Sequence, residues 1–222
     1  MKRYTAIIII LLIIVLSYFA FPLLITHPVK TISLTAGDFE HIQFSTKNPT
    51  IYRYQKNVLV IEVDNSASFL MQAFDTVKHV NNVSFEWKSN GLPTINDAGH
   101  EARREGDDAV FKLGLLIEAD EELTSLFLPS WMRRVNELLN FNSGGMFFLV
   151  AGAKHTAEQD WPGPYNKRMT MIAMENVSDF QGWSKASYQF SEPVKVVALW
   201  LMADGDDTSS SFTVHVKNIS LE

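Results

Sequence analysis

The feature that most constrains this fold is the alternation of apolar and polar residues, which recurs in short segments along most of the chain. Residues 59–63, 83–87 and 212–217 each place every second, apolar side chain on one face. Two further segments, 146–153 and 193–203, are almost continuously apolar. The alternation is typical of half-buried β-strands, and the continuous runs are typical of strands that are covered on both faces.

Additional strands are predicted in the remaining apolar segments, and turn-rich segments separate them. The candidates are residues 31–35, 50–54, 69–74, 109–118 and 168–175. About ten strands without alternating helices favour an all-β fold, an antiparallel β-sandwich or jelly roll, over a fold with a parallel sheet.

Residues 120–140 form the exception, because their apolar side chains recur at helical spacing and Pro129 marks a break. We predict a short helical insert of two amphipathic helices between strands. Its apolar stripe, which includes Trp131, Val135 and Leu138, is expected to cover an open end of the sandwich. The alternative is that this stripe docks on a membrane surface or on a membrane-protein partner.

The N-terminal segment contains an unbroken apolar run from Ala6 to Ile25. Twenty helical residues span roughly 30 Å, the thickness of a bilayer core, and the run is longer than the apolar region of a typical cleaved signal peptide. We therefore predict a transmembrane anchor rather than a cleaved signal. Lys2 and Arg3 precede the run, which by the positive-inside rule places the N-terminus in the cytoplasm.

These assignments divide the chain into a cytoplasmic stub (1–5), the anchor (6–25), a linker (26–30) and a β-sandwich ectodomain (31–222). The expected location is the bacterial inner membrane, with a single pass and the C-terminal domain in the periplasm. The formal net charge of −6 argues against a nucleic-acid partner. The absence of cysteine excludes thiolate nucleophiles and most structural zinc sites.

Three aspartates, Asp204, Asp206 and Asp207, surround Gly205 near the C-terminus. Their spacing lets carboxylates converge on a hard cation, and a structural Ca²⁺ is the one cofactor that the sequence suggests. The alternative, which we favour for this stretch, is a tight turn in which aspartate side chains accept hydrogen bonds from the backbone.

A second acidic pair, Asp107 and Asp108, comes just before a predicted strand that contains Lys112. If the fold brings this pair beside residues 204–207, the carboxylates need either a cation or a basic partner to offset their repulsion. We favour a salt bridge to Lys112 over a metal ion.

A proline-stiffened loop, "QDWPGPYNK", carries Trp161, Tyr165 and Asn166. Sugar rings stack on exposed aromatic side chains, while carboxamides and carboxylates bind the hydroxyl groups. Together with Trp183, these residues form a predicted ligand-binding platform for a glycan. The alternative is that Trp161 folds inward and closes the end of the sandwich.

Five segments in the second part of the chain resemble a known family. They are "VSFEWKSNGLP", "RREGDDAVFKLGLLIE", "MFFLVAGA", "RMTMIAMENVSDFQGWSKASYQF" and "VVALWLMADGDDTSSSFTVHVKNISLE". In this order, over about residues 82–222, they resemble the bacterial domain-of-unknown-function family 3047. The resemblance implies a secreted or anchored β-sandwich of the galactose-binding-like or jelly-roll type, and it implies no defined activity.

The family pattern consists of a Trp-x-Trp-Lys-like strand, Gly-Asp-Asp before an arginine-bearing strand, and a terminal Asp-x-Asp-Asn-Thr turn. The matching positions are Trp87, Lys88, Gly106, Asp107, Asp108, Asp204, Asp206, Asp207 and Thr208. This chain departs from the pattern at three places: Phe85 replaces a tryptophan, Lys112 replaces the arginine, and Asp207 replaces the asparagine.

The sequence therefore predicts a membrane-anchored periplasmic β-sandwich that binds a ligand, with a glycan or another envelope component as the first choice. A structural or assembly subunit of a membrane complex is the alternative, and an enzyme acting on envelope polysaccharide comes third. We favour binding over catalysis because many proteins with sandwich folds are not enzymes. The absence of Gly-x-Ser-x-Gly and His-Glu-x-x-His motifs further argues against nucleophilic and zinc chemistry.

Overall fold

The computed structural model describes residues 30–120, 128–179 and 181–222. The predicted stub and anchor (1–25) lie outside these ranges, as does the linker except for Lys30. Within the described ranges, no helix has the length and apolar character needed to cross a membrane.

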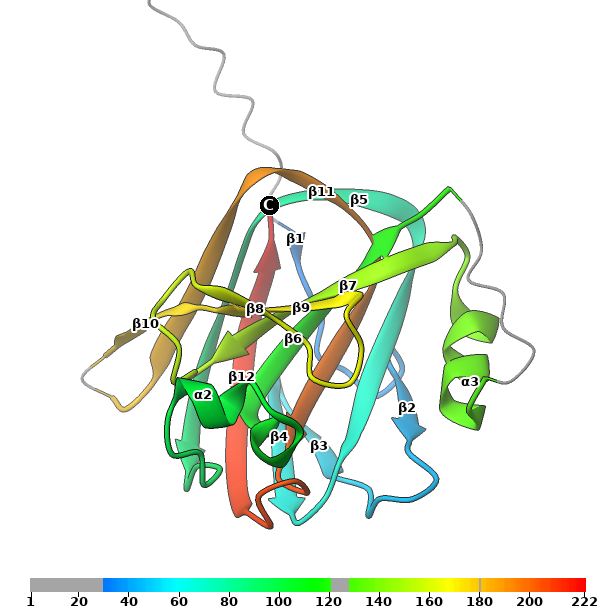
Figure 1. Cartoon of the computed structure of the whole chain (residues 1–222). Coiled ribbons are helices and arrows are strands. Elements are labelled where there is room, and N and C mark those ends of the chain that lie inside the picture. Colours follow the sequence, from blue (N-terminus) through cyan, green and yellow to red (C-terminus); the bar gives the residue numbers. More distant parts are fainter. Residues whose placement is uncertain (1–29, 121–127, 180) are drawn as a thin grey trace, which may run out of the picture.

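The protein is mostly β, and its strands form two layers that share two long, bent strands (Figure 1). The shared strands are β5 (Ser68–Asn90) and β11 (Ser184–Asp204), which pair with each other along most of their length. The first layer adds β1 (Lys30–Thr31), β3 (Ile51–Gln55), β4 (Val58–Asp64), β10 (Glu175–Ser178) and β12 (Ser211–Leu221). The second layer adds β2 (Glu40–Gln43), β6 (Ala109–Glu118), β7 (Ser143–Ala151), β8 (Asp160–Pro162) and β9 (Met169–Ala173). The prediction of a mostly-β sandwich is confirmed.

The corner at which β11 changes layer contains Pro193. The pairing register with β5 shifts between Gln189 and Val194. Because proline has no N–H to donate, it interrupts the ladder and lets the strand turn from one layer into the other. At the matching corner of β5, the backbone N–H of Asn82 donates to the carbonyl oxygen of Glu222 at 3.0 Å. The C-terminal residue therefore pairs with the bend.

The main apolar core lies between the two layers. The alternating residues that were predicted to face inward are buried there: Leu59, Ile61, Val63, Val83, Phe85, Trp87, Phe212, Val214 and Val216. From the second layer they are met by Leu113 and Leu115 of β6 and by Leu199 and Leu201 of β11. The period-two pattern thus identified the inward face of these strands correctly.

Several strand predictions need correction. Residues 69–74 and 83–87 belong to one continuous strand, β5, whereas the segment 168–175 contains β9 and the start of β10. Of the strand predicted at 31–35, Thr31 alone lies in β1, although the N–H of Ile32 also donates to the carbonyl oxygen of Ile219 at 2.8 Å.

The sheet is also not wholly antiparallel, because β7 and β9 pair in parallel. The chain runs back after β7 through β8 and returns in β9, and β9 takes the place beside β7. The residue types explain this order. Met171 and Ile172 of β9 are buried on opposite faces, whereas Asp160 and Pro162 of β8 are exposed and suit an edge strand.

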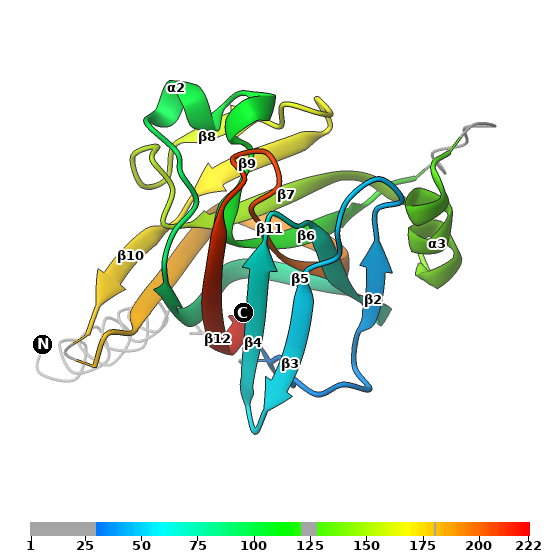
Figure 2. The ribbon, with the colours of Figure 1, turned by 90° about the horizontal axis from the view of Figure 1, so that it is seen from below.

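Two short helical elements, α2 (Ala98–Glu101) and η1 (Arg104–Gly106), lie in the connection from β5 to β6. A longer helix, α3 (Ser130–Leu138), covers the outer face of the second layer beside β2 (Figures 1 and 2). Val135 is buried against that face, and Trp131 and Leu138 pack around it. The apolar stripe is therefore packed within the fold, but it covers the outer face of the second layer rather than the open end of the sandwich that was predicted. The first predicted helix of the insert falls mainly on 121–127, outside the described residues.

Candidate functional site

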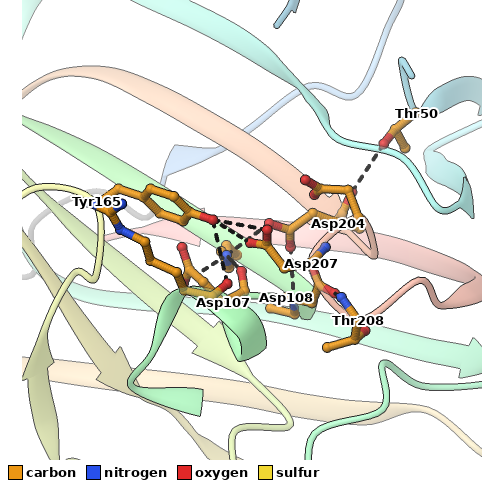
Figure 3. A network of polar contacts seen from close by, with 12 residues as sticks. Thr50, Asp107, Asp108, Tyr165, Asp204, Asp207 and Thr208 are labelled. Carbon is orange, nitrogen blue, oxygen red and sulfur yellow. Dashed lines mark hydrogen bonds and ion pairs between the residues drawn. The ribbon is translucent and has the colours of Figure 1, made fainter. Parts of the chain in front are cut away.

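The two acidic turns meet at one end of the second layer. Strands β6 and β11 are antiparallel neighbours, and Asp204 at the end of β11 lies opposite Ala109 at the start of β6. Asp107 and Asp108 immediately precede β6, so they reach the turn that follows β11. Figure 3 shows the resulting network of polar contacts.

Lys112 is the basic partner of this cluster. Its side chain is almost fully buried, and its ammonium group donates to the carbonyl oxygen of Asp107 at 2.5 Å and to Oδ2 of Asp204 at 2.9 Å. Oδ1 of Asp107 lies 3.3 Å from the same nitrogen. The other carboxylate oxygen of Asp204 accepts the backbone N–H of Ala109 at 2.9 Å. The predicted salt bridge is therefore present.

Burial and the neighbouring charges shift the pKa values of this cluster in opposite directions. Burial alone would lower the pKa of Lys112, but the carboxylates of Asp107 and Asp204 more than offset this and raise it. Lys112 is thus charged at neutral pH. Burial raises the pKa of Asp107 above its ordinary value despite the nearby lysine, and burial also raises the pKa of Asp207. The buried ammonium group of Lys112 thus serves two carboxyl groups, those of Asp107 and Asp204.

Asp108 holds the turn at 205–209. Its carboxylate accepts the backbone N–H groups of Asp207 at 3.2 Å and of Thr208 at 2.6 Å. Gly205 is required at the start of the turn, because a Cβ there would lie 2.5 Å from the carbonyl oxygen of Ser210 and 2.9 Å from Val63. The favoured prediction of a tight turn is correct, although the carboxylate that caps it comes from the other acidic pair.

Asp206 and Asp207 face two side chains from distant loops. The ammonium group of Lys47, on the loop between β2 and β3, contacts Asp206 and lies 3.7 Å from Asp207. The hydroxyl group of Tyr165 donates to Asp207 at 2.9 Å. Burial and the charge of Asp207 raise the pKa of Tyr165, so that this hydroxyl keeps its proton.

The carboxylates that could hold a cation overlap in part with the predicted set, which was Asp204, Asp206 and Asp207 with Asp107 and Asp108 as possible additions. Oxygen atoms of Asp108, Asp206 and Asp207 lie within 4.8 Å of one another. Asp204, which the sequence placed among the metal ligands, is instead occupied by Lys112 and the N–H of Ala109. Oxygen ligands at this spacing suit Ca²⁺, and the structural-calcium hypothesis now concerns these three residues.

A pocket of about 440 Å³ opens beside the acidic cluster, on the outer face of the second layer. Its polar end is formed by Asp107, Lys112, Asp204, Asp206 and Asp207. Its apolar floor and wall are formed by Phe44, Trp131, Phe148, Met169, Met171, Trp200 and Met202. Lys47 and Tyr165 also line the pocket, and both contact Asp207. The pocket therefore has one charged end and one apolar end.

Trp200 is the centre of the apolar end. Its ring stacks on Phe69 with 3.3 Å between ring centroids, and the edges of Trp131 and Phe148 pack on it at 5.9 and 5.7 Å. A side chain at position 114 would collide with this arrangement, because a Cβ on Gly114 would lie 2.9 Å from both Phe148 and Trp200. Glycine in the middle of β6 thus lets two large aromatic rings lie over that strand.

The predicted glycan platform does not form as expected. Trp161 is buried and stacks on His155 at 3.8 Å, while Asn166 is exposed and accepts the N–H of Arg168. Trp183 lies 4.8 Å from the ammonium of Lys88 and 4.1 Å from that of Lys217. These two lysines lie on the outer side of the first layer, away from the pocket. Of the four predicted residues, only Tyr165 lines the pocket.

Several residues of the pocket were not predicted from the sequence. Trp200 and Phe148 lie in strands whose continuous apolar character concealed which face each residue takes. Lys47 and Phe44 belong to a loop without a distinctive motif. A usable signal was Lys112 itself, since a lysine within an otherwise apolar strand needs a buried partner.

Comparison with known proteins gives a family but no activity. A family model described as "Protein of unknown function (DUF3047)" matches residues 38–220. No curated protein sequence matches this chain. Among solved structures, the chain resembles the xyloglucanase domain of NopAA, a type three effector from Sinorhizobium fredii, in complex with cellobiose. The likeness covers 88% of this chain and 96% of that chain, at 8% sequence identity and a TM-score of 0.38. Because the family model spans most of the sequence, including both acidic motifs, this chain belongs to the family DUF3047.

Proposed function

We propose that this protein is a binding module whose outer-face pocket takes a glycan. The observation that carries the proposal is the pairing of an aromatic wall with a group of carboxylates inside one pocket of 440 Å³. Aromatic side chains such as Trp131 can pack on the C–H face of a sugar ring, and carboxylates such as that of Asp207 can accept its hydroxyl groups. The volume is within the usual range for small-molecule sites, roughly 300 to 1,000 Å³.

The membrane anchor and the periplasmic location predicted from the sequence belong to the same proposal. An anchor at 6–25 would hold the pocket close to the membrane surface, where envelope glycans are found. The apolar run from Ala6 to Ile25 supports the anchor, and the basic residues Lys2 and Arg3 before it support the orientation.

Binding can be tested with the full chain in lipid nanodiscs, by titration calorimetry against cellobiose, maltose and N,N′-diacetylchitobiose. We expect at least one of these disaccharides to bind, and we expect Trp131→Ala to weaken that binding about tenfold, as the loss of an aromatic contact of about 1 to 2 kcal/mol. Trp183→Ala is the matched control, because Trp183 lies outside the pocket, and it should leave the affinity within about twofold. Equal losses in both variants would contradict the assignment of the pocket.

A further inference from the structure

We infer that the ligand of this pocket is a sugar joined to an alkyl or acyl chain rather than a bare glycan. The inference rests on the proposed function and specifies the class of molecule at the same site. It follows from the separation of the pocket into a charged end and an apolar end.

The apolar end is unsuited to sugar hydroxyl groups. Its floor consists of Phe148, Met171, Trp200 and Met202, with Met169 beside them. None of these side chains offers a strong hydrogen-bond acceptor, and the one polar group among them is the buried, unpartnered Nε1–H of Trp200, which can donate a single hydrogen bond. A bare oligosaccharide that filled the pocket would therefore bury more hydroxyl groups than this single donor can satisfy, which is costly.

The same surface is well suited to a hydrocarbon chain. Met169, Met171 and Met202 are unbranched and can adapt their conformation to a flexible apolar ligand. Phe44 and Trp131 close the wall above them, with ring centroids 5.5 Å apart. An alkyl chain that leaves water for this surface gains free energy with each buried methylene group.

The charged end selects the head of the ligand. It contains the carboxylates of Asp107, Asp206 and Asp207, whereas Lys47 and Lys112, the cations that line it among the described residues, are already paired with aspartates. Carboxylates accept hydrogen bonds from hydroxyl groups and repel phosphate or carboxylate groups. A polyhydroxylated, uncharged head therefore fits this end, and a fatty acid or an anionic phospholipid does not.

The experiment compares matched ligands on the full chain in nanodiscs, using tryptophan fluorescence below the micelle concentration of each amphiphile. The probes are glucose, cellobiose, octyl β-glucoside and octanoate, and the series is repeated with galactose and octyl β-galactoside. We expect an octyl glycoside to bind at least tenfold more tightly than its parent sugar, than cellobiose and than octanoate.

Two pairs of variants test whether the octyl glycoside binds in the pocket. The control variant in each pair corrects the fluorescence change for amphiphile that partitions into the lipid. Met169→Gln keeps the side-chain length but adds a polar group, and it should weaken octyl glycoside binding at least fivefold. Met132→Gln is its control, since Met132 is similarly half-buried on α3 but does not line the pocket. Asp207→Asn should reduce the preference for the glycoside over octanoate at least threefold, whereas Asp160→Asn, on the exposed edge strand β8, should not.

The outcomes separate this inference from the proposed function. If cellobiose binds as tightly as the octyl glycosides, the inference is wrong and glycan binding stands. If octanoate binds as tightly as the glycosides, the inference is also wrong, because the head is not selected. If no sugar-bearing probe binds, both the inference and the proposed function fail.

Discussion

The two faces of strands β6 and β11 have opposite characters, although both are largely buried. The inner face presents Leu113 and Leu199 to the core between the layers, and neither has any exposed surface. The outer face presents Lys112 and Asp204 at one end and Trp200 in the middle, next to an open pocket. The comparison shows that the inner face is selected for packing alone, whereas the outer face carries charges that only a specific set of partners can stabilise.

The largest effect is expected from breaking the ion pair of the outer face. Lys112→Met removes the cation and leaves Asp107 and Asp204 buried without a partner. We expect a loss of about 3 to 5 kcal/mol in the free energy of unfolding, measured by urea denaturation. A second change, Asp204→Asn in the same chain, should recover part of the loss because it removes one of the unpaired charges. A cost below about 1 kcal/mol for the single variant would show that the pair is not buried as described.

A smaller difference in the free energy of unfolding is expected between side-chain truncations on the inner face and on the outer face. Leu199→Ala opens a closed cavity in the inner core and should cost about 3 to 4 kcal/mol. Met202→Ala enlarges a space that is already open to the pocket, so we expect a cost of about 2 kcal/mol. The order should be reversed for ligand affinity. Met202→Ala should lose ligand binding, whereas Leu199→Ala should keep it. Equal effects on both properties would mean that the outer face is part of an ordinary core.

The smallest effect should come from the pH dependence of Asp207. Because the folded state raises the pKa of this carboxyl above its ordinary value of 3.8, its proton is held more firmly in the folded than in the unfolded chain. The resulting stabilisation is fully present below pH 3.8 and is lost as the pH rises through the folded pKa. Asp207→Asn should therefore melt slightly higher than the wild type at pH 7, and the difference should vanish below pH 3.8. A variant that melts lower at pH 7 would show that the charged carboxylate is a net stabiliser.

The sequence predicted the inner face better than the outer face. Alternation in residues 83–87 and 212–217 identified the inward side chains because the inner face tolerates only apolar residues. Trp161 shows the opposite case. Its position between a charged residue and two prolines suggested an exposed platform, but the ring stacks on His155, which is held by Glu101 at 2.6 Å. The pattern around a residue in a loop does not specify which way its side chain turns.

By itself, the sequence determined that the chain forms a sandwich of strands, which residues of the alternating strands face the core between the layers, and that Asp206 and Asp207 lie in a turn that directly follows Asp204. These properties depend on neighbours within a few residues, and alternation and turn chemistry report them directly. Only the tertiary structure decided which acidic, basic and aromatic side chains share a pocket. Asp108 and Thr208 are 100 residues apart and are joined because β6 pairs with β11, a relation between distant strands that no local spacing encodes.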